Sequence, residues 1–116
     1  MSEASLQKKV MKRLKKEVGG WWVKMHGGPF QSRGLPDIIG CVKGKFIGVE
    51  LKVPGNKPTE LQEAVIDKIN KEGEALAFWS DNADHIIKTI KEYIGEEDKH
   101  ESTRKVSTKG NKRNRS

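Results

Sequence analysis

A β-hairpin centred on Lys43 and Gly44 is the feature that most limits what this chain of 116 residues can fold into. Two runs of strand-forming residues, 37–42 and 45–53, are separated by only these two residues, a spacing typical of a hairpin. Both faces of the second run carry bulky side chains, which is typical of a central strand covered on both sides. The hairpin therefore predicts the middle of a sheet with helices packed on its faces.

Three segments with apolar residues at helical spacing predict the covering helices. They are 2–18, 60–72 after a capping box of Thr59 and Gln62, and 83–94, which we expect to end at Gly95. The inward face of the second helix is expected to hold Leu61, Val65, Ile66 and Ile69. Shorter apolar runs at 21–25 and 75–79 predict two further strands. The expected order is α-β-β-β-α-β-α, an α/β fold with a mixed four-stranded sheet flanked by helices.

The net charge of +7 is concentrated towards the C-terminal end. Six of the 23 Lys and Arg residues lie in 102–116, a segment that contains no Asp or Glu. Such a segment cannot bury enough apolar surface to offset the entropy of ordering it, so we expect a disordered basic tail, 96–116, after a domain of residues 1–95. A basic tail attracts polyanions, most commonly nucleic acid, although it can also serve only to keep a chain in solution. The candidate DNA contacts in the tail are Arg104, Lys105, Lys112 and Arg113.

Composition excludes several other classes of protein. No apolar run reaches the roughly 18 residues of a membrane span, and the N-terminal segment holds Glu3 and several lysines rather than an apolar secretory core. Cys41 is the single cysteine, which excludes an internal disulfide framework and a zinc site built from several cysteines. We therefore expect a cytoplasmic protein without a membrane partner.

Two carboxylates and a lysine are predicted to meet at one end of the sheet. If the hairpin turn has two residues, Asp37 lies opposite Glu50, and Lys52 projects from the same face. A three-residue turn would instead shift the register by one and direct Asp37 away from Glu50. A separate alternative is that Asp37 only begins a turn after Pro36, while Glu50 and Lys52 lie on an exposed strand face. Paired like charges on central strands are costly without a cation between them, and oxygen ligands of this kind suit Mg²⁺ or Mn²⁺.

The same residues resemble a known family. Three segments carry the likeness: Gly34-Leu35-Pro36-Asp37-Ile38-Ile39-Gly40, then Phe46-Ile47-Gly48-Val49-Glu50-Leu51-Lys52, then Thr59-x-x-Gln62. They are similar to the motifs of the PD-(D/E)xK nuclease superfamily, and more narrowly of its virus-type replication-repair nuclease (VRR-NUC) group, whose small stand-alone members occur in phages. Glu3 ahead of Leu6-Gln7 matches the helix-1 glutamate of that pattern. The resemblance covers residues 3–94.

The resemblance implies a fold, an activity and a set of site residues. It implies a restriction-endonuclease-like αβββαβ core, divalent-metal-dependent hydrolysis of phosphodiester bonds without an organic cofactor, and a homodimer that acts on branched DNA. Asp37 and Glu50 would bind the metal together with the backbone carbonyl of Leu51. Lys52 would orient or deprotonate the attacking water, and Glu3 would bind the metal through water or hold a second ion.

Other side chains leave two interpretations open. Gln62 is either a capping residue or part of the site. His26 and Arg33 border the glycine-rich loop, and Lys12 and Lys16 lie on the polar face of the first helix, so each either contacts DNA or is simply solvated. Core packing rather than base stacking is expected for the three tryptophans, Trp21, Trp22 and Trp79.

The resemblance, together with the predicted cluster of carboxylates, implies a metal-dependent DNA endonuclease that prefers branched DNA such as Holliday junctions or flaps. One alternative is a nucleic-acid-binding module that keeps the nuclease fold without turnover. Another is a small α/β adaptor whose tail docks on RNA or on an acidic protein. The enzyme is favoured because every position of the expected metal site is filled by a residue of the expected type.

Overall fold

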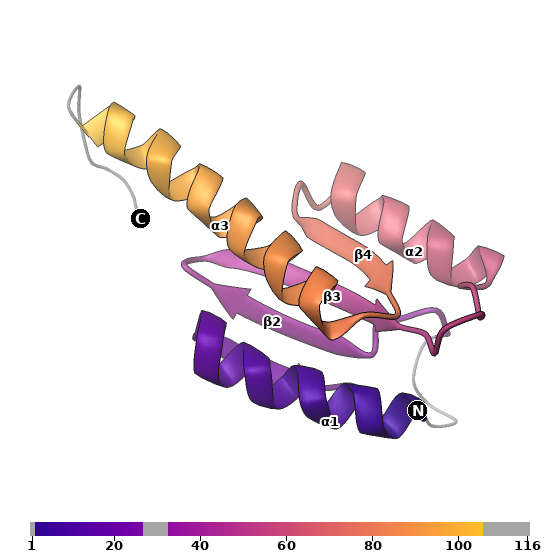
Figure 1. The fold of residues 1–116 in the computed structure, drawn as a ribbon. Coiled ribbons are helices and arrows are strands. Elements are labelled where there is room, and N and C mark those ends of the chain that lie inside the picture. Colours follow the sequence, from indigo (N-terminus) through magenta and orange to yellow (C-terminus); the bar gives the residue numbers. More distant parts are fainter. Residues whose placement is uncertain (1, 27–32, 106–116) are drawn as a thin grey trace.

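The computed structural model describes the backbone of residues 2–26 and 33–105, and the side chains of these ranges up to Gly95. The elements, in chain order, are α1 (Glu3–Arg13), a π-helical turn (Leu14–Val18), β1 (Trp21–Lys24), β2 (Ile38–Val42), β3 (Lys45–Leu51), α2 (Glu60–Lys71), β4 (Leu76–Ser80) and α3 (Ala83–Lys105). This order, which the reader can follow in Figure 1, confirms the predicted one. Within the described ranges no helix is both long and apolar enough to cross a lipid bilayer.

The strands form one mixed sheet in the order β1-β2-β3-β4. β2 is antiparallel to both β1 and β3, whereas β4 is parallel to β3. Ile38 pairs with Val49, so the predicted register of the hairpin is confirmed. Lys43 and Gly44 have positive φ angles of 54° and 80°, which a two-residue type I′ turn requires. The turn thus sets the register that brings the carboxylates to the same end of the sheet.

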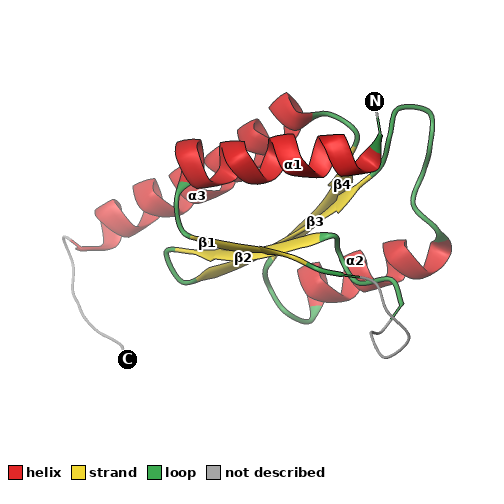
Figure 2. Cartoon of the chain, turned by 90° about the horizontal axis from the view of Figure 1, so that it is seen from below, coloured by secondary structure: helices red, strands yellow, loops and turns green. Residues whose placement is uncertain are grey.

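Helices cover the two faces of the sheet unequally. Figure 2 shows α1 and α3 on one face and α2 on the other. The core lies under α1 and α3 and includes Leu6, Val10, Leu14, Ile38, Ile47, Val49, Leu51, Ile86 and Ile90. A fully buried Leu or Ile contributes roughly 1.5–3 kcal/mol, so this face supplies most of the hydrophobic stabilisation.

Helix α2 is packed more loosely than its sequence indicates. None of its residues is buried, and Leu61 is 48% exposed, so the prediction that Leu61 points inward is wrong. The main contacts of α2 are with β3 and β4, so only a narrow stripe of it meets the sheet, and Leu61 lies against Gly34 instead. The side-chain amide of Asn70 bonds the N–H and the C=O of Ala77 at 2.8 and 2.9 Å. These bonds pair the main chain of Ala77 on the open edge of β4.

Two helix ends differ from the sequence prediction. The first helix changes to its π-helical turn before Gly19, and α3 continues past Gly95 to Lys105. One glycine costs a helix only about 1 kcal/mol relative to alanine, and the turn before Gly95 is anchored by buried Ile90 and Ile94. The first part of the expected disordered tail is therefore helical, while residues 106–116 lie outside the described part of the chain.

The three tryptophans do not share one environment. Trp22 is buried in the core, and its indole N–H donates to the carbonyl of Gly19 at 2.7 Å. Trp21 is 60% exposed and Trp79 is 36% exposed, so core packing is confirmed for Trp22 and is wrong for the other two. Trp21 and Trp79 lie on β1 and β4, the two edge strands of the sheet.

Candidate functional site

Asp37 is held at the end of the sheet where β2 begins. Continuing the ladder between β2 and β3 by one residue places Asp37 opposite Glu50. The carbonyl oxygen of Asp37 accepts a hydrogen bond from the N–H of Met25, and its carboxylate Oδ2 accepts one from the N–H of Leu51, both at 2.8 Å. The N–H and C=O of a strand residue face the same neighbouring strand. The main chain of Leu51 therefore supplies a donor that orients Asp37 and a carbonyl oxygen on the same side.

Glu50 is a buried carboxylate with one unpaired oxygen. Only 2% of the residue is exposed. Its Oε2 accepts a hydrogen bond from Nε2 of Gln62 at 2.8 Å and lies 3.4 Å from Nζ of Lys52. Its Oε1 is buried, and no group in the described part of the chain donates to it. Because an unpaired buried carboxylate oxygen is costly, Glu50 is the strongest single indication of a cation site.

The negative charge of Glu50 is only partly compensated by neighbouring groups of the protein. The pKa of Glu50 is raised to about 7, first by burial and next by the negative charge of Asp37. The ammonium group of Lys52 lowers this pKa but does not offset the burial. A divalent cation between the two carboxylates would replace their repulsion by attraction.

Glu3 reaches the same place from the first turn of α1. Its pKa is raised by burial and then by the charge of Asp37 and a hydrogen bond with it, so the two carboxyl groups are neighbours. Glu17, near the other end of this helical segment, pairs with Arg13 at 2.7 Å instead. The structure therefore places Glu3, and not Glu17, beside the predicted site.

Gln7 also contacts the site, although no pattern in the sequence had predicted a role for it. Its Nε2 donates to the carbonyl oxygen of Asp37 at 3.3 Å. Because Gln7 follows Glu3 by one helical turn, this bond attaches the N-terminal turn of α1 to the residue that Glu3 faces. The i, i+4 spacing of Glu3 and Gln7 is the sequence signal that could have identified it.

Gln62 satisfies both interpretations of its position. Its Oε1 accepts a hydrogen bond from the N–H of Thr59 at 2.8 Å, and Oγ1 of Thr59 accepts one from the N–H of Gln62 at 3.1 Å, which completes a capping box. The nitrogen of the same amide donates to Glu50. The first turn of α2 and the orientation of the Glu50 carboxylate therefore depend on one side chain.

Among the side chains that the structure describes, the other candidate residues make no hydrogen bond or ion pair with these carboxylates. His26 and Arg33 are exposed and border residues 27–32, which lie outside that part. Lys12 is exposed about 14 Å further along the helix than Glu3, and Lys16 is further still. Of the tail residues, Arg104 and Lys105 belong to the helical end of α3, and Lys112 and Arg113 lie outside the described residues.

The oxygens present suit a small, hard cation. Across the described residues, no group of three or more His, Cys, Asp or Glu side chains could hold a metal ion by itself. Asp37, Glu50 and the carbonyl of Leu51 nevertheless converge, with Glu3 beside them. Mg²⁺ commonly binds one or two protein carboxylates and completes its shell with waters and substrate phosphate. The residues therefore fit Mg²⁺ or Mn²⁺.

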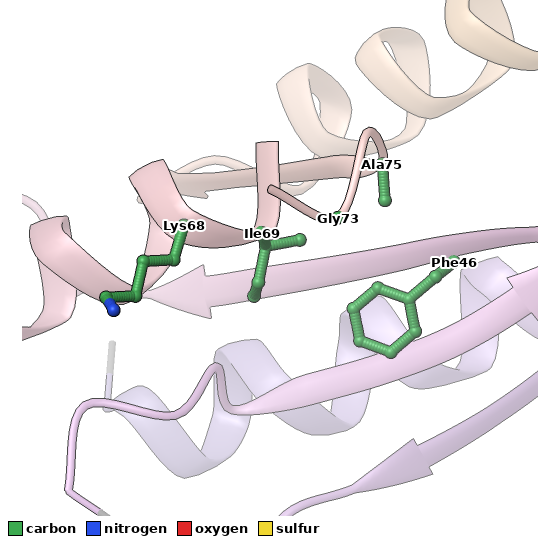
Figure 3. A pocket seen from close by; sticks show the side chains of 5 residues that line it. All are labelled: Phe46, Lys68, Ile69, Gly73 and Ala75. Carbon is green, nitrogen blue, oxygen red and sulfur yellow. The ribbon is translucent and has the colours of Figure 1, made fainter. Parts of the chain in front are cut away.

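Figure 3 shows the side chains that line an apolar hollow of about 320 Å³. It is lined by Phe46, Lys68, Ile69, Gly73 and Ala75. These residues belong to the beginning of β3, the second half of α2 and the loop after it, whereas the carboxylates lie near the end of β3 and the beginning of α2. The hollow is therefore separate from the candidate site.

Comparison with known proteins yields a match among solved structures. No family sequence model matches this chain, and no curated protein matches it. A solved VRR_NUC domain has a TM-score of 0.64 and 27% sequence identity with it, and the match covers 78% of this chain and 96% of the other. The predicted fold class, a mixed four-stranded sheet flanked by helices, is therefore confirmed.

Proposed function

We propose that this chain, which is similar to a solved VRR_NUC domain, is a divalent-metal-dependent DNA endonuclease that hydrolyses phosphodiester bonds. The observation that carries the proposal is the unpaired, buried oxygen of Glu50 beside Asp37 and Lys52. Metal-assisted hydrolysis uses carboxylates that bind the cation and a neighbouring cationic side chain that stabilises the phosphate. This chemistry needs no protein nucleophile.

Each group of the cluster has its own task in this proposal. Asp37, Glu50 and the carbonyl of Leu51 hold Mg²⁺ or Mn²⁺, which when bound polarises the phosphoryl oxygen and lowers the pKa of bound water. Lys52 orients the attacking water and offsets the negative charge of the phosphate. Glu3 contributes a further carboxylate, which binds the metal through water or holds a second ion.

Two glutamines keep these groups in position. Gln62 engages Oε2 of Glu50, which leaves Oε1 for the cation. Gln7 holds the main chain of Asp37 and thereby sets the distance between Asp37 and Glu3. Such outer contacts commonly change metal affinity 10- to 100-fold when they are removed.

The finer proposal concerns the substrate and the surroundings of the enzyme. We propose that it acts as a cytoplasmic homodimer of phage origin on branched DNA such as Holliday junctions or flaps, because the VRR-NUC resemblance implies a protein of this kind. We assign the contacts with DNA phosphates to Lys, Arg and His side chains that are exposed or lie near the C-terminal end. These side chains donate hydrogen bonds that phosphate oxygens accept. These are Lys12, Lys16, His26, Arg33, Arg104, Lys105, Lys112 and Arg113.

A cleavage assay tests the proposal. End-labelled four-way junction, flap and linear duplex are incubated with the protein in Mg²⁺, in Mn²⁺ or in EDTA. Asp37→Ala and Glu50→Ala are assayed beside Glu92→Ala, which removes an exposed carboxylate from α3. We expect metal-dependent cleavage that is lost in the first two variants and retained in the third.

Two outcomes would contradict the proposal. Cleavage that persists in EDTA or in both site variants would separate the activity from these carboxylates. Tight DNA binding without cleavage in either metal would instead favour a catalytically silent binding module on the same fold. The ranking of the three substrates decides whether branched DNA is preferred.

A further inference from the structure

Trp79 lies directly beside Glu50 on the face of the sheet that carries the candidate site. In the parallel ladder between β3 and β4, Glu50 is paired with Trp79. Successive strand residues point to opposite faces, so Trp79 shares the face of Glu50, whereas Phe78 packs against the core on the other face. The backbones of adjacent strands are about 4.8 Å apart, so Trp79 is the direct neighbour of Glu50 across the ladder between β3 and β4.

The indole of Trp79 is open to a ligand. The residue is 36% exposed, although it is one of the largest apolar side chains of the chain. Among the described residues no group accepts a hydrogen bond from its indole N–H, whereas the N–H of buried Trp22 is bonded to Gly19. An aromatic ring that is exposed beside a site for phosphate chemistry offers a stacking surface for a base of the substrate strand.

We propose that Trp79 stacks on an unpaired nucleobase next to the phosphodiester bond that is cleaved. The inference rests on the proposed nuclease function and narrows its substrate. Bases in an intact duplex are already stacked on their neighbours, so they present no free face to a tryptophan. The substrate class that uses Trp79 is therefore DNA with an unpaired nucleotide at the cleavage point, such as a flap, rather than fully paired duplex.

Trp21 provides a matched control. It is 60% exposed and pairs with Cys41, which in turn pairs with Phe46. Phe46 precedes Glu50 by four residues, so Trp21 lies on the same face but about 13 Å further along the sheet. Replacing it removes an exposed indole from this face without touching the surroundings of Glu50.

The test measures binding of a flap and of a duplex in Ca²⁺, which has the charge of Mg²⁺ but a different coordination preference. For Trp79→Ala we expect a rise in Kd for the flap that exceeds the rise for the duplex by about 5- to 100-fold. Trp79→Phe should retain most of the affinity, and Trp79→Leu, which has bulk but no aromatic ring, should not. Trp21→Ala should bind both DNAs within about twofold of the unmodified protein.

Abasic flaps test the same contact without relying on any one variant. Removing the base next to the cut should weaken binding by the unmodified protein about as much as Trp79→Ala does, and should weaken binding by Trp79→Ala no further. The stacking inference fails, while the proposed function stands, if the unmodified protein cleaves the flap but binds every abasic flap as tightly as the intact one. The same holds if Trp79→Leu binds the flap as tightly as the unmodified protein. If the unmodified protein neither binds nor cleaves any DNA, the proposed function fails and this inference fails with it.

Discussion

Replacing Glu50 by glutamine should stabilise the metal-free protein above pH 7 while abolishing its cleavage of DNA. Glutamine has nearly the same shape, and its oxygen can still accept hydrogen bonds from Gln62 and Lys52. It carries no charge towards Asp37. Glu50→Gln therefore isolates the cost of ionising one buried carboxyl group in the folded protein.

The magnitude follows from the two pKa values of Glu50. The unfolded chain releases this proton near the ordinary pKa of 4.5, and the folded protein releases it near 7. Because the folded state holds the proton more tightly, the free energy of unfolding falls as the pH rises between these two values. At about 1.36 kcal/mol for each pH unit between them, the loss is about 3 kcal/mol at pH 8 and less than about 1 kcal/mol at pH 5. The variant does not incur this loss.

Urea unfolding in EDTA, followed by circular dichroism at pH 5, 6, 7 and 8, measures the effect. The stability difference between Glu50→Gln and the unmodified protein should grow with pH to about 3 kcal/mol, whereas Glu92→Gln should change stability by less than about 0.5 kcal/mol throughout. Adding Mg²⁺ should stabilise only the proteins that keep Glu50. A difference that is independent of pH, or a variant that is less stable at pH 8, would refute the conclusion that the Glu50 charge is uncompensated.

Three further variants test neighbouring contacts. Lys52→Met should lower the rate of single-turnover cleavage about 100-fold or more. It should also move the midpoint of the pH–rate profile upwards, because Lys52 lowers the pKa of Glu50. An unchanged rate would exclude Lys52 from catalysis. Gln62→Ala should cost about 1 kcal/mol of stability and weaken Mg²⁺ binding about 10- to 100-fold in calorimetry, whereas Thr59→Ala should lose only the cap; equal metal affinities would contradict this division. Asn70→Ala should destabilise the protein by about 1–3 kcal/mol in urea unfolding, because it leaves the N–H and C=O of Ala77 without their partner. A loss below about 0.5 kcal/mol would indicate that water replaces the bonds to Ala77.

The hairpin and the residues that it aligns were predictable because their signals are local. Alternation along 37–42 and 45–53, together with the turn at Lys43 and Gly44, defines the register, and the register alone places Asp37 opposite Glu50. The capping box at Thr59 likewise needs only four consecutive residues. The resemblance to the VRR-NUC motifs added Glu3 and the backbone carbonyl of Leu51 as further candidate metal ligands.

Helix ends and partial burial were less predictable because they depend on distant neighbours. Gly95 resembles a helix end in isolation, yet the packing of Ile90 and Ile94 on the core supports the helix that passes through it. Leu61 lies in an apolar stripe, yet the position of α2 over β3 and β4 leaves it half exposed. Neither outcome is visible in the periodicity of one segment.

The sequence by itself determined the order of elements, the register of the hairpin and the residue types available to a metal. Only the tertiary structure decided that Gln62 joins the cap to Glu50, that Gln7 holds Asp37, and that Trp79 stands open beside the site. The physical reason is the difference between interactions that are local in the sequence and interactions between distant segments. Backbone conformation is set by a few consecutive residues, whereas the distance between two side chains on different elements depends on how those elements pack, which no single segment encodes.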